Sequence, residues 1–224
     1  MDFMRLLKSL EELLYELASW LVFYPMTMWR ALRHPQAMMR YADMELADDA
    51  ASQYAETLSP PLFLLITLLI AHGLEMSMLR QATQAALPPL LANDSNLLIF
   101  RAVTFSIFPL LMAVKLLRHR KIPLDRNTLR PPFYSQCYVA APFAFALSVA
   151  FLLLRVENPV TVVAGLATFV VALLWYLVVE TRWFMADLKL SSSRAALLVI
   201  VTMCEALVIM FLAGAFVAYG LNSR

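Results

Sequence analysis

The chain has 224 residues, of which 62% are apolar and 15% are charged, and its mean hydropathy is +0.70. This composition excludes an ordinary soluble domain, which carries more charge, and favours an integral membrane protein. The net charge of +2 says little about partners, because it averages loops on two sides of a membrane. For an integral membrane protein we expect the lipid bilayer as a partner and no nucleic acid.

Residues 1–59 are predicted to form a helical segment at the cytosolic face and membrane interface. Its first part has apolar residues at helical i, i+3, i+4, i+7 spacing. They are Phe3, Met4, Leu6, Leu7, Leu10, Leu13, Leu14 and Leu17, and the opposite face carries Arg5, Lys8, Glu11, Glu12 and Glu16. The pattern predicts an amphipathic helix along the interface. Because its polar face is more acidic than that of typical lipid-seeking helices, packing against the bundle or a partner is an alternative to membrane sensing.

Residues 41–56 are rich in alanine and predict a second, acidic helix on the cytosolic side. The acidic residues are Asp43, Glu45, Asp48, Asp49 and Glu56. We expect this helix to dock by charge complementarity on the basic segment 115–130. A divalent cation on Asp48 and Asp49 is a weaker alternative, because adjacent carboxylates point to different sides of a helix.

The remainder, residues 60–224, is predicted to be a five-span transmembrane domain. Each span needs about 20 mostly apolar residues. The predicted spans are 61–79, 97–117, 137–155, 159–180 and 195–219. The fold class is therefore an all-α polytopic membrane helix bundle with an N-terminal amphipathic interfacial helix and a cytosolic acidic helix.

Prolines and small residues give local detail within this domain. The pairs Pro60-Pro61 and Pro131-Pro132 are expected to precede spans, and Pro88-Pro89 to lie in an external loop. Pro109 and Pro142 fall inside spans and predict bends. The small residues expected at close helix contacts are Ala164, Thr168 and Ala172 in the fourth span, and Gly214 and Ala218 in the fifth.

The distribution of lysine and arginine predicts the orientation. Segments 1–60, 118–136 and 181–194 hold most of the basic residues, which places them and the N-terminus in the cytosol and the C-terminus in the periplasm of a bacterial inner membrane. The candidates for contacts with anionic lipid headgroups are Lys115, Arg118, Arg120, Lys121, Arg126 and Arg130. Plain topological anchoring by the same residues is the alternative.

Four ionisable residues lie inside predicted spans, where charge is costly: His72, Glu75, Arg101 and Glu205. Glu75 and Arg101 fall at the same depth in neighbouring spans, which predicts an ion pair or hydrogen bond with His72 one turn deeper. The cluster is interpreted either as a structural fastener or as a site for a proton or substrate.

Glu205 lies near the middle of the fifth span. Left alone it would be protonated, because burial disfavours the charged form. We expect it to hydrogen-bond to Thr202, Cys204 or a polar group of another span. Both a functional and a structural role are open at this point.

No enzyme, cofactor or metal motif is recognisable, so we expect no catalytic activity, no cofactor and no metal ion. The four glycines cannot build a phosphate-binding loop, and three histidines exclude a histidine-rich metal site. The two cysteines, Cys137 and Cys204, have neither a disulfide pattern nor metal-ligand spacing and are interpreted as structural.

A Pro-x-x-x-Trp-Arg motif lies before the first span, in the segment Phe23-Tyr-Pro-Met-Thr-Met-Trp-Arg-Ala-Leu-Arg-His-Pro35. With the five spans over residues 60–220, it resembles bacterial members of the Yip-domain superfamily, five-span proteins with a cytosolic N-terminus that are often described as permease-like. The Asp-Leu-Tyr-Gly-Pro signature of the eukaryotic members is absent, so the resemblance implies no trafficking role and assigns no catalytic residue.

These observations favour a small multi-pass inner-membrane protein that acts as a membrane scaffold or accessory subunit through its cytosolic helices. Its partner would be another membrane protein or a second copy of the chain. The alternative is a transporter or channel subunit that uses Glu205 and the cluster of His72, Glu75 and Arg101.

Overall fold

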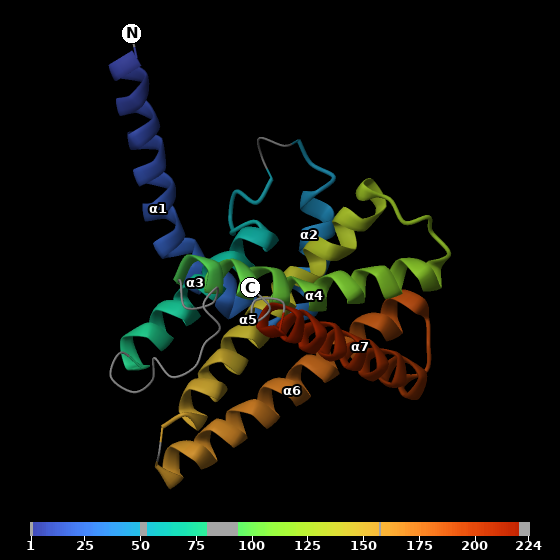
Figure 1. Cartoon of the computed structure of the whole chain (residues 1–224). Coiled ribbons are helices and arrows are strands. Elements are labelled where there is room, and N and C mark those ends of the chain that lie inside the picture. Colours follow the sequence, from blue (N-terminus) through green and yellow to red (C-terminus); the bar gives the residue numbers. More distant parts are fainter. Residues whose placement is uncertain (1, 50–52, 80–93, 157, 220–224) are drawn as a thin grey trace.

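The computed structural model describes residues 2–49, 53–79, 94–156 and 158–219, and this part of the chain is all-helical, as predicted. Figure 1 shows the arrangement. The helices are α1 (Asp2–Arg33), α2 (Pro35–Glu45), α3 (Pro60–Leu79), α4 (Asp94–Arg120), α5 (Arg126–Leu154), α6 (Pro159–Leu188) and α7 (Ser192–Tyr219).

Five of these helices, α3 to α7, are long and apolar enough to cross a membrane, which supports the multi-pass prediction. Two boundaries differ from those predicted. The third span was predicted to begin at residue 137, but α5 begins at Arg126, and the fourth was predicted to end at 180, but α6 continues to Leu188. Hydropathy locates the apolar part of a helix, whereas its ends depend on capping and packing. The turn between Leu154 and Pro159 lies as predicted.

A capping box explains the early start of α5. The Asp125 carboxylate accepts hydrogen bonds from the backbone N–H groups of Asn127 (2.8 Å) and Thr128 (2.9 Å). The Thr128 hydroxyl oxygen in turn accepts from the N–H of Asp125 (3.0 Å). These contacts satisfy amides that a helix leaves open at its first turn. As a result, Pro131 and Pro132 lie inside α5 instead of preceding it, which corrects that prediction.

This cap predicts a pH-dependent contribution to stability. The hydrogen bonds from Thr128 and Asn127 lower the pKa of the Asp125 carboxyl. Because the folded pKa lies below the unfolded one, the stabilisation is present above the unfolded pKa and is lost as pH falls through the folded pKa. Asp125→Asn can still cap but cannot titrate. Acid denaturation in detergent micelles should show a step in the wild type that is missing in this variant, and an identical acid limb in both proteins would contradict the assignment.

The proline and loop predictions elsewhere had mixed outcomes. Pro60 begins α3 as expected, and Pro109 and Pro142 lie inside α4 and α5. The pair Pro88-Pro89 lies outside the described residues.

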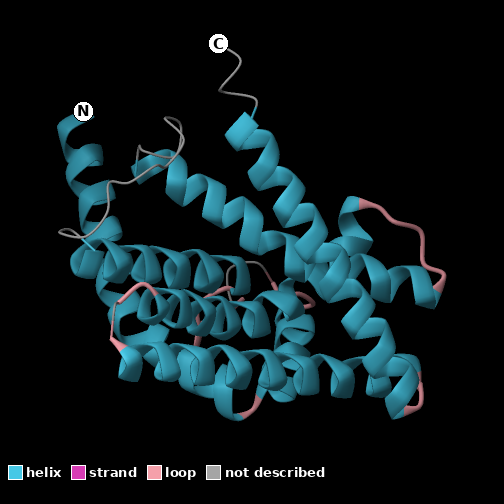
Figure 2. Cartoon of the chain, turned by 60° about the horizontal axis from the view of Figure 1, so that its bottom comes forward, coloured by secondary structure: helices cyan, strands magenta, loops and turns pink. Residues whose placement is uncertain are grey.

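Helix α1 is one continuous helix that passes through Pro25 and is much longer than the predicted amphipathic segment. Figures 1 and 2 both show it running across the direction of the spanning helices, with its N-terminal half extending away from them. Its C-terminal half is anchored: the Tyr24 and Phe63 rings lie 5.6 Å apart, and the Thr27 hydroxyl oxygen accepts from the N–H of Leu58 (3.3 Å).

The predicted acidic helix over 41–56 is wrong in its second half. Helix α2 ends at Glu45, and the described residues that follow form turns. The Glu45 carboxylate accepts a hydrogen bond from the backbone N–H of Tyr54, whose φ of 59° is left-handed. The Gln53 side chain donates to the carbonyl of Asp48 (2.8 Å). These contacts fold the acidic run back on the end of α2, which propensity alone does not predict.

The predicted docking on the basic segment takes a different form. Asp43 accepts a hydrogen bond of 2.7 Å from the Ser135 hydroxyl on α5, and Glu56 lies 3.8 Å from Arg30 of α1. Arg120 forms its ion pair with Asp187 on α6. Helix α2 therefore docks on α5 through Asp43 and its buried apolar residues. The positive charge of Arg120 also acts on the Asp43 carboxyl, so charge complementarity with the 115–130 segment contributes.

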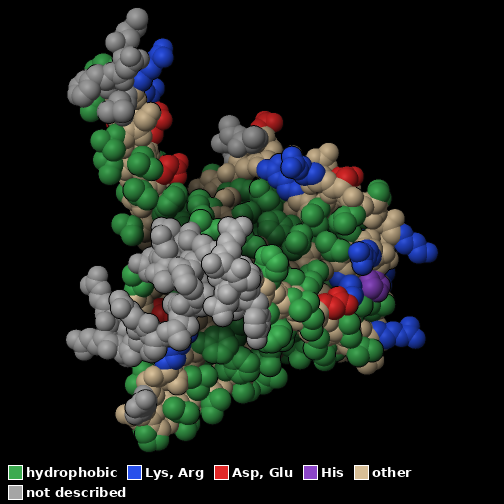
Figure 3. All heavy atoms as spheres, viewed as in Figure 1, with side chains coloured by type: hydrophobic (Ala, Val, Ile, Leu, Met, Phe, Trp, Pro, Cys, Tyr) green, Lys and Arg blue, Asp and Glu red, His purple; other side chains and the backbone are tan. Residues whose placement is uncertain are grey.

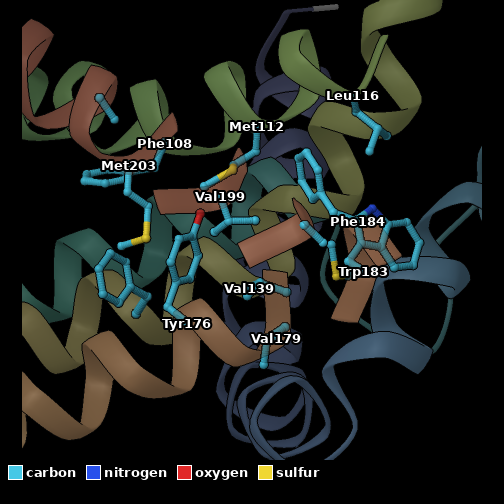
Figure 4. Packing of buried hydrophobic residues seen from close by; sticks show 14 of the residues in the cluster. Phe108, Met112, Leu116, Val139, Tyr176, Val179, Trp183, Phe184, Val199 and Met203 are labelled. Carbon is cyan, nitrogen blue, oxygen red and sulfur yellow. The ribbon is translucent and has the colours of Figure 1, made fainter. Parts of the chain in front are cut away.

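The core forms around α5, which packs against α1, α2, α3, α4 and α6. Figure 4 shows the larger apolar cluster, where α4, α6 and α7 meet. At its centre the rings of Phe143 and Tyr176 are stacked with centroids 4.3 Å apart, and Phe108 meets both edge-on. This packing fixes how α4, α5 and α6 are rotated, and so decides which polar side chains meet.

The small-residue predictions are partly corrected. The close contact between α5 and α6 lies at Gly165, where an added Cβ would be 3.0 Å from the Ala150 carbonyl oxygen. Ala172 is buried on this face, but Ala164 is exposed. A Cβ added at Gly214 would have no neighbour within 4 Å, so Gly214 makes no close contact within the described chain.

Candidate functional site

The predicted pair between Glu75 and Arg101 is present and links α3 to α4. Both side chains are 20% exposed, so the pair is partly shielded from solvent. Arg155, at the end of α5, pairs with the other oxygen of the same carboxylate. One carboxylate therefore holds the ends of three helices. Arg155 was not predicted as a partner, although it follows a span that ends on the same side of the membrane as the first.

His72 is buried one turn from Glu75 and lies against the arginine. Its Nδ1 atom is 3.4 Å from Nη1 of Arg101. A guanidinium group only donates hydrogen bonds, so Nδ1 must be the acceptor and the imidazole carries its proton on Nε2. In this contact His72 of α3 accepts from Arg101 of α4, so the two residues add a second link between these helices.

Glu205 on α7 binds Lys115 on α4, with Nζ at 2.7 and 2.9 Å from its two carboxylate oxygens. Of the predicted partners, the polar group of another span is therefore the correct one. The Thr202 hydroxyl donates instead to the carbonyl of Leu198, and Cys204 is exposed. The Glu205 side chain is 45% exposed and the Lys115 side chain 19%.

The surroundings of Glu205 are apolar. It lies on an open groove of about 450 Å³ whose other lining residues are Ile200, Val201, Cys204, Val208 and Ile209. A path for ions or polar substrates needs a continuous row of polar groups across the membrane. Apart from Glu205, the residues that line this groove do not supply such a row.

The six candidate lipid-binding residues do not form one loop. Lys115, Arg118 and Arg120 belong to α4, and Arg126 and Arg130 to α5, so that only Lys121 lies in the connection. Lys115 and Arg120 are bound to Glu205 and Asp187. The other four are exposed, and Arg130 also lies over the Tyr134 ring, 5.2 Å from its centroid. Figure 3 shows Lys and Arg gathered toward the side where α4 ends and α5 begins.

A third carboxylate inside the bundle was missed. Glu180 on α6 is fully buried and accepts a hydrogen bond of 3.0 Å from the side-chain amide of Gln136 on α5. The predicted span ended at residue 180, and Glu180 was not among the candidate residues. The apolar Trp183-Phe184-Met185 run after it was the signal that the buried helix continues.

Among the described residues, no three His, Cys, Asp or Glu side chains lie together in a way that could hold a metal ion. The acidic residues that do lie inside the bundle are bound to arginine, lysine or glutamine. The arrangement can fix helices relative to one another.

No protein-family model, no curated protein and no solved structure matches this chain.

Proposed function

We propose that this chain is a membrane scaffold or accessory subunit, a small permease-like protein whose N-terminal helix binds a partner at the membrane surface. The observation that carries the proposal is the free half of α1. It extends from the bundle across the direction of the spans, and it carries exposed leucines at Leu7, Leu10, Leu13, Leu14 and Leu17. Five spans already suffice to hold a protein in a bilayer, so anchoring does not require the free half of α1, which we call the arm.

The two faces of the arm support different contacts. Figure 3 shows hydrophobic side chains along the left edge of α1 and acidic side chains along its right edge. An amphipathic helix at an interface turns its apolar face to the lipid. Glu11, Glu12 and Glu16 would then face the cytosol, where they suit a partner with a basic surface.

The location we propose is the bacterial inner membrane, with the N-terminus in the cytosol and the C-terminus in the periplasm. This orientation rests on the excess of lysine and arginine in segments 1–60, 118–136 and 181–194. The exposed residues Arg118, Lys121, Arg126 and Arg130 would meet anionic headgroups on that side. A relation to the Yip-domain superfamily rests on the Pro25-x-x-x-Trp29-Arg30 segment, in which Trp29 is exposed on α1.

The geometry favours this role over a transporter or channel subunit. The carboxylates proposed for transport are both in ion pairs, Glu75 with two arginines and Glu205 with Lys115. A transport site has to exchange its charge partner for a substrate or proton during turnover. The apolar groove beside Glu205 gives such a ligand no continuous polar route.

Charge reversal on the arm tests the proposal. Glu12→Lys with Glu16→Lys should reduce co-purification of the partner from mild detergent at least about tenfold, as expected when like charges face each other across an interface. The control, Asp48→Lys, reverses the charge of an exposed residue outside α1 and should retain the partner. If both variants recover the same proteins as the wild type, the acidic face of α1 is not a binding surface.

A further inference from the structure

Glu180 is the buried acid whose charge has no counterpart. Its side chain is fully buried between α5 and α6, and Gln136, a neutral amide, is its hydrogen-bond partner. None of the ion pairs in the described part of the chain includes it. An isolated carboxylate in an apolar interior is strongly disfavoured, and such a group neutralises instead of remaining charged.

The two side chains also leave a matching pair of open acceptors. The Gln136 amide nitrogen donates to Oε2 of Glu180, which leaves Oε1 of Glu180 and Oε1 of Gln136 buried without a partner among the described residues. Two acceptor oxygens cannot bond to each other. A single hydrogen on the Glu180 oxygen turns it into a donor, and the amide oxygen of Gln136 is the acceptor that is left open.

We infer that Glu180 is a proton-binding site: the folded protein holds it as a neutral acid that forms a reciprocal pair with the amide of Gln136. The amide donates to the carboxyl C=O oxygen and the carboxyl O–H donates to the amide oxygen. The inference is independent of the role proposed for α1.

The groups that face this pair do not offer a competing positive charge. On α6, Tyr176 and Trp183 lie about one turn to either side of Glu180, and the Tyr176 hydroxyl and the Trp183 indole nitrogen are buried without a partner among the described residues. On α5, Cys137 follows Gln136. None of these side chains carries a positive charge. On α2, Met39 enters the same core, and the Gln36 side chain donates to the carbonyl of Val179 (2.7 Å).

The charged residues of the helices around Glu180 are either bound to other groups or exposed, as Arg40 of α2, Arg182 of α6 and Arg194 of α7 are. Asp43 of α2 binds Ser135, Arg120 of α4 binds Asp187, and Lys115 of α4 binds Glu205 of α7. Val139 of α5 and Val179, Trp183 and Phe184 of α6, which lie within four positions of Gln136 or Glu180 in the sequence, belong to the larger apolar cluster drawn in Figure 4. A proton is therefore the ligand that fits the open oxygens.

Infrared spectroscopy of the purified full-length protein tests the inference. At neutral pH the wild type should show a C=O band of a protonated carboxyl group that shifts in heavy water. Glu180→Gln should remove the whole band while keeping the fold, since a second amide can form the same reciprocal pair. Glu205→Gln, which removes an acid already bound to Lys115, should leave the band unchanged.

Three results would overturn the inference: no protonated-carboxyl band at neutral pH, a band that survives Glu180→Gln, or a thermal midpoint that rises with sodium or potassium in the wild type but not in Glu180→Gln. The last would identify a bound cation in place of the proton. If Glu180→Gln does not fold, Gln136→Leu serves instead: loss of the amide should shift the band to higher frequency, and an unshifted band would contradict the pairing.

Discussion

Glu75→Arg is expected to destabilise the bundle by about 3 kcal/mol or more, the cost of breaking a shielded ion pair. The substitution replaces the carboxylate that holds Arg101 and Arg155 with a third guanidinium. Three positive charges would then meet where α3, α4 and α5 end. Unfolding in mixed detergent micelles measures the loss, and Arg118→Glu, at an exposed position of α4, should have little effect.

Restoring the opposite charge should rescue part of this loss. In the double variant Glu75→Arg with Arg101→Glu, the pair between α3 and α4 forms again in reverse. Arg155 still faces the new arginine, so the rescue should be incomplete and should improve when Arg155→Gln is added. A double variant no more stable than Glu75→Arg alone would show that the two residues do not act as a pair.

Gly165→Ala is expected to cost about 1–3 kcal/mol, the usual penalty for overfilling a close contact. The added Cβ would lie 3.0 Å from both the Ala150 carbonyl oxygen and Cγ of Leu154. A backbone oxygen cannot move aside as a side chain can, so α5 and α6 would have to separate. Loss of unfolding free energy in mixed micelles measures the effect.

The same change at Gly214 is the matched control. A Cβ there has no neighbour within 4 Å, so Gly214→Ala should be neutral or stabilise α7 by about 0.5–1 kcal/mol. Equal losses at both positions would mean that α5 and α6 are not in close contact at Gly165.

The spans could be predicted from the sequence because hydropathy depends on composition along the chain and not on neighbours. The early start of α5 could not, since it depends on the reciprocal bonds of Asp125 and Thr128. The second half of the predicted acidic helix over 41–56 was misread for a related reason. Its alanines favour a helix, but Tyr54 donates to Glu45 and the described residues 46–47 and 53–56 form turns.

The candidate site was predictable where depth alone decides a contact. Glu75 and Arg101 lie at one depth in adjacent spans, and they meet. The pair of Lys115 and Glu205 and the pair of Gln136 and Glu180 depend on how each helix is rotated about its axis. That rotation is set by core packing, including the stacked rings of Phe143 and Tyr176, which a single sequence does not reveal.

The measurement that most directly tests the proposed role compares two variants in one co-purification experiment. Glu12→Lys with Glu16→Lys changes the surface of α1, while Lys115→Met with Glu205→Gln removes the charged pair between α4 and α7. The first variant should lose its partner and the second should retain it. Loss of the partner only when Lys115 and Glu205 are replaced would contradict the proposed role.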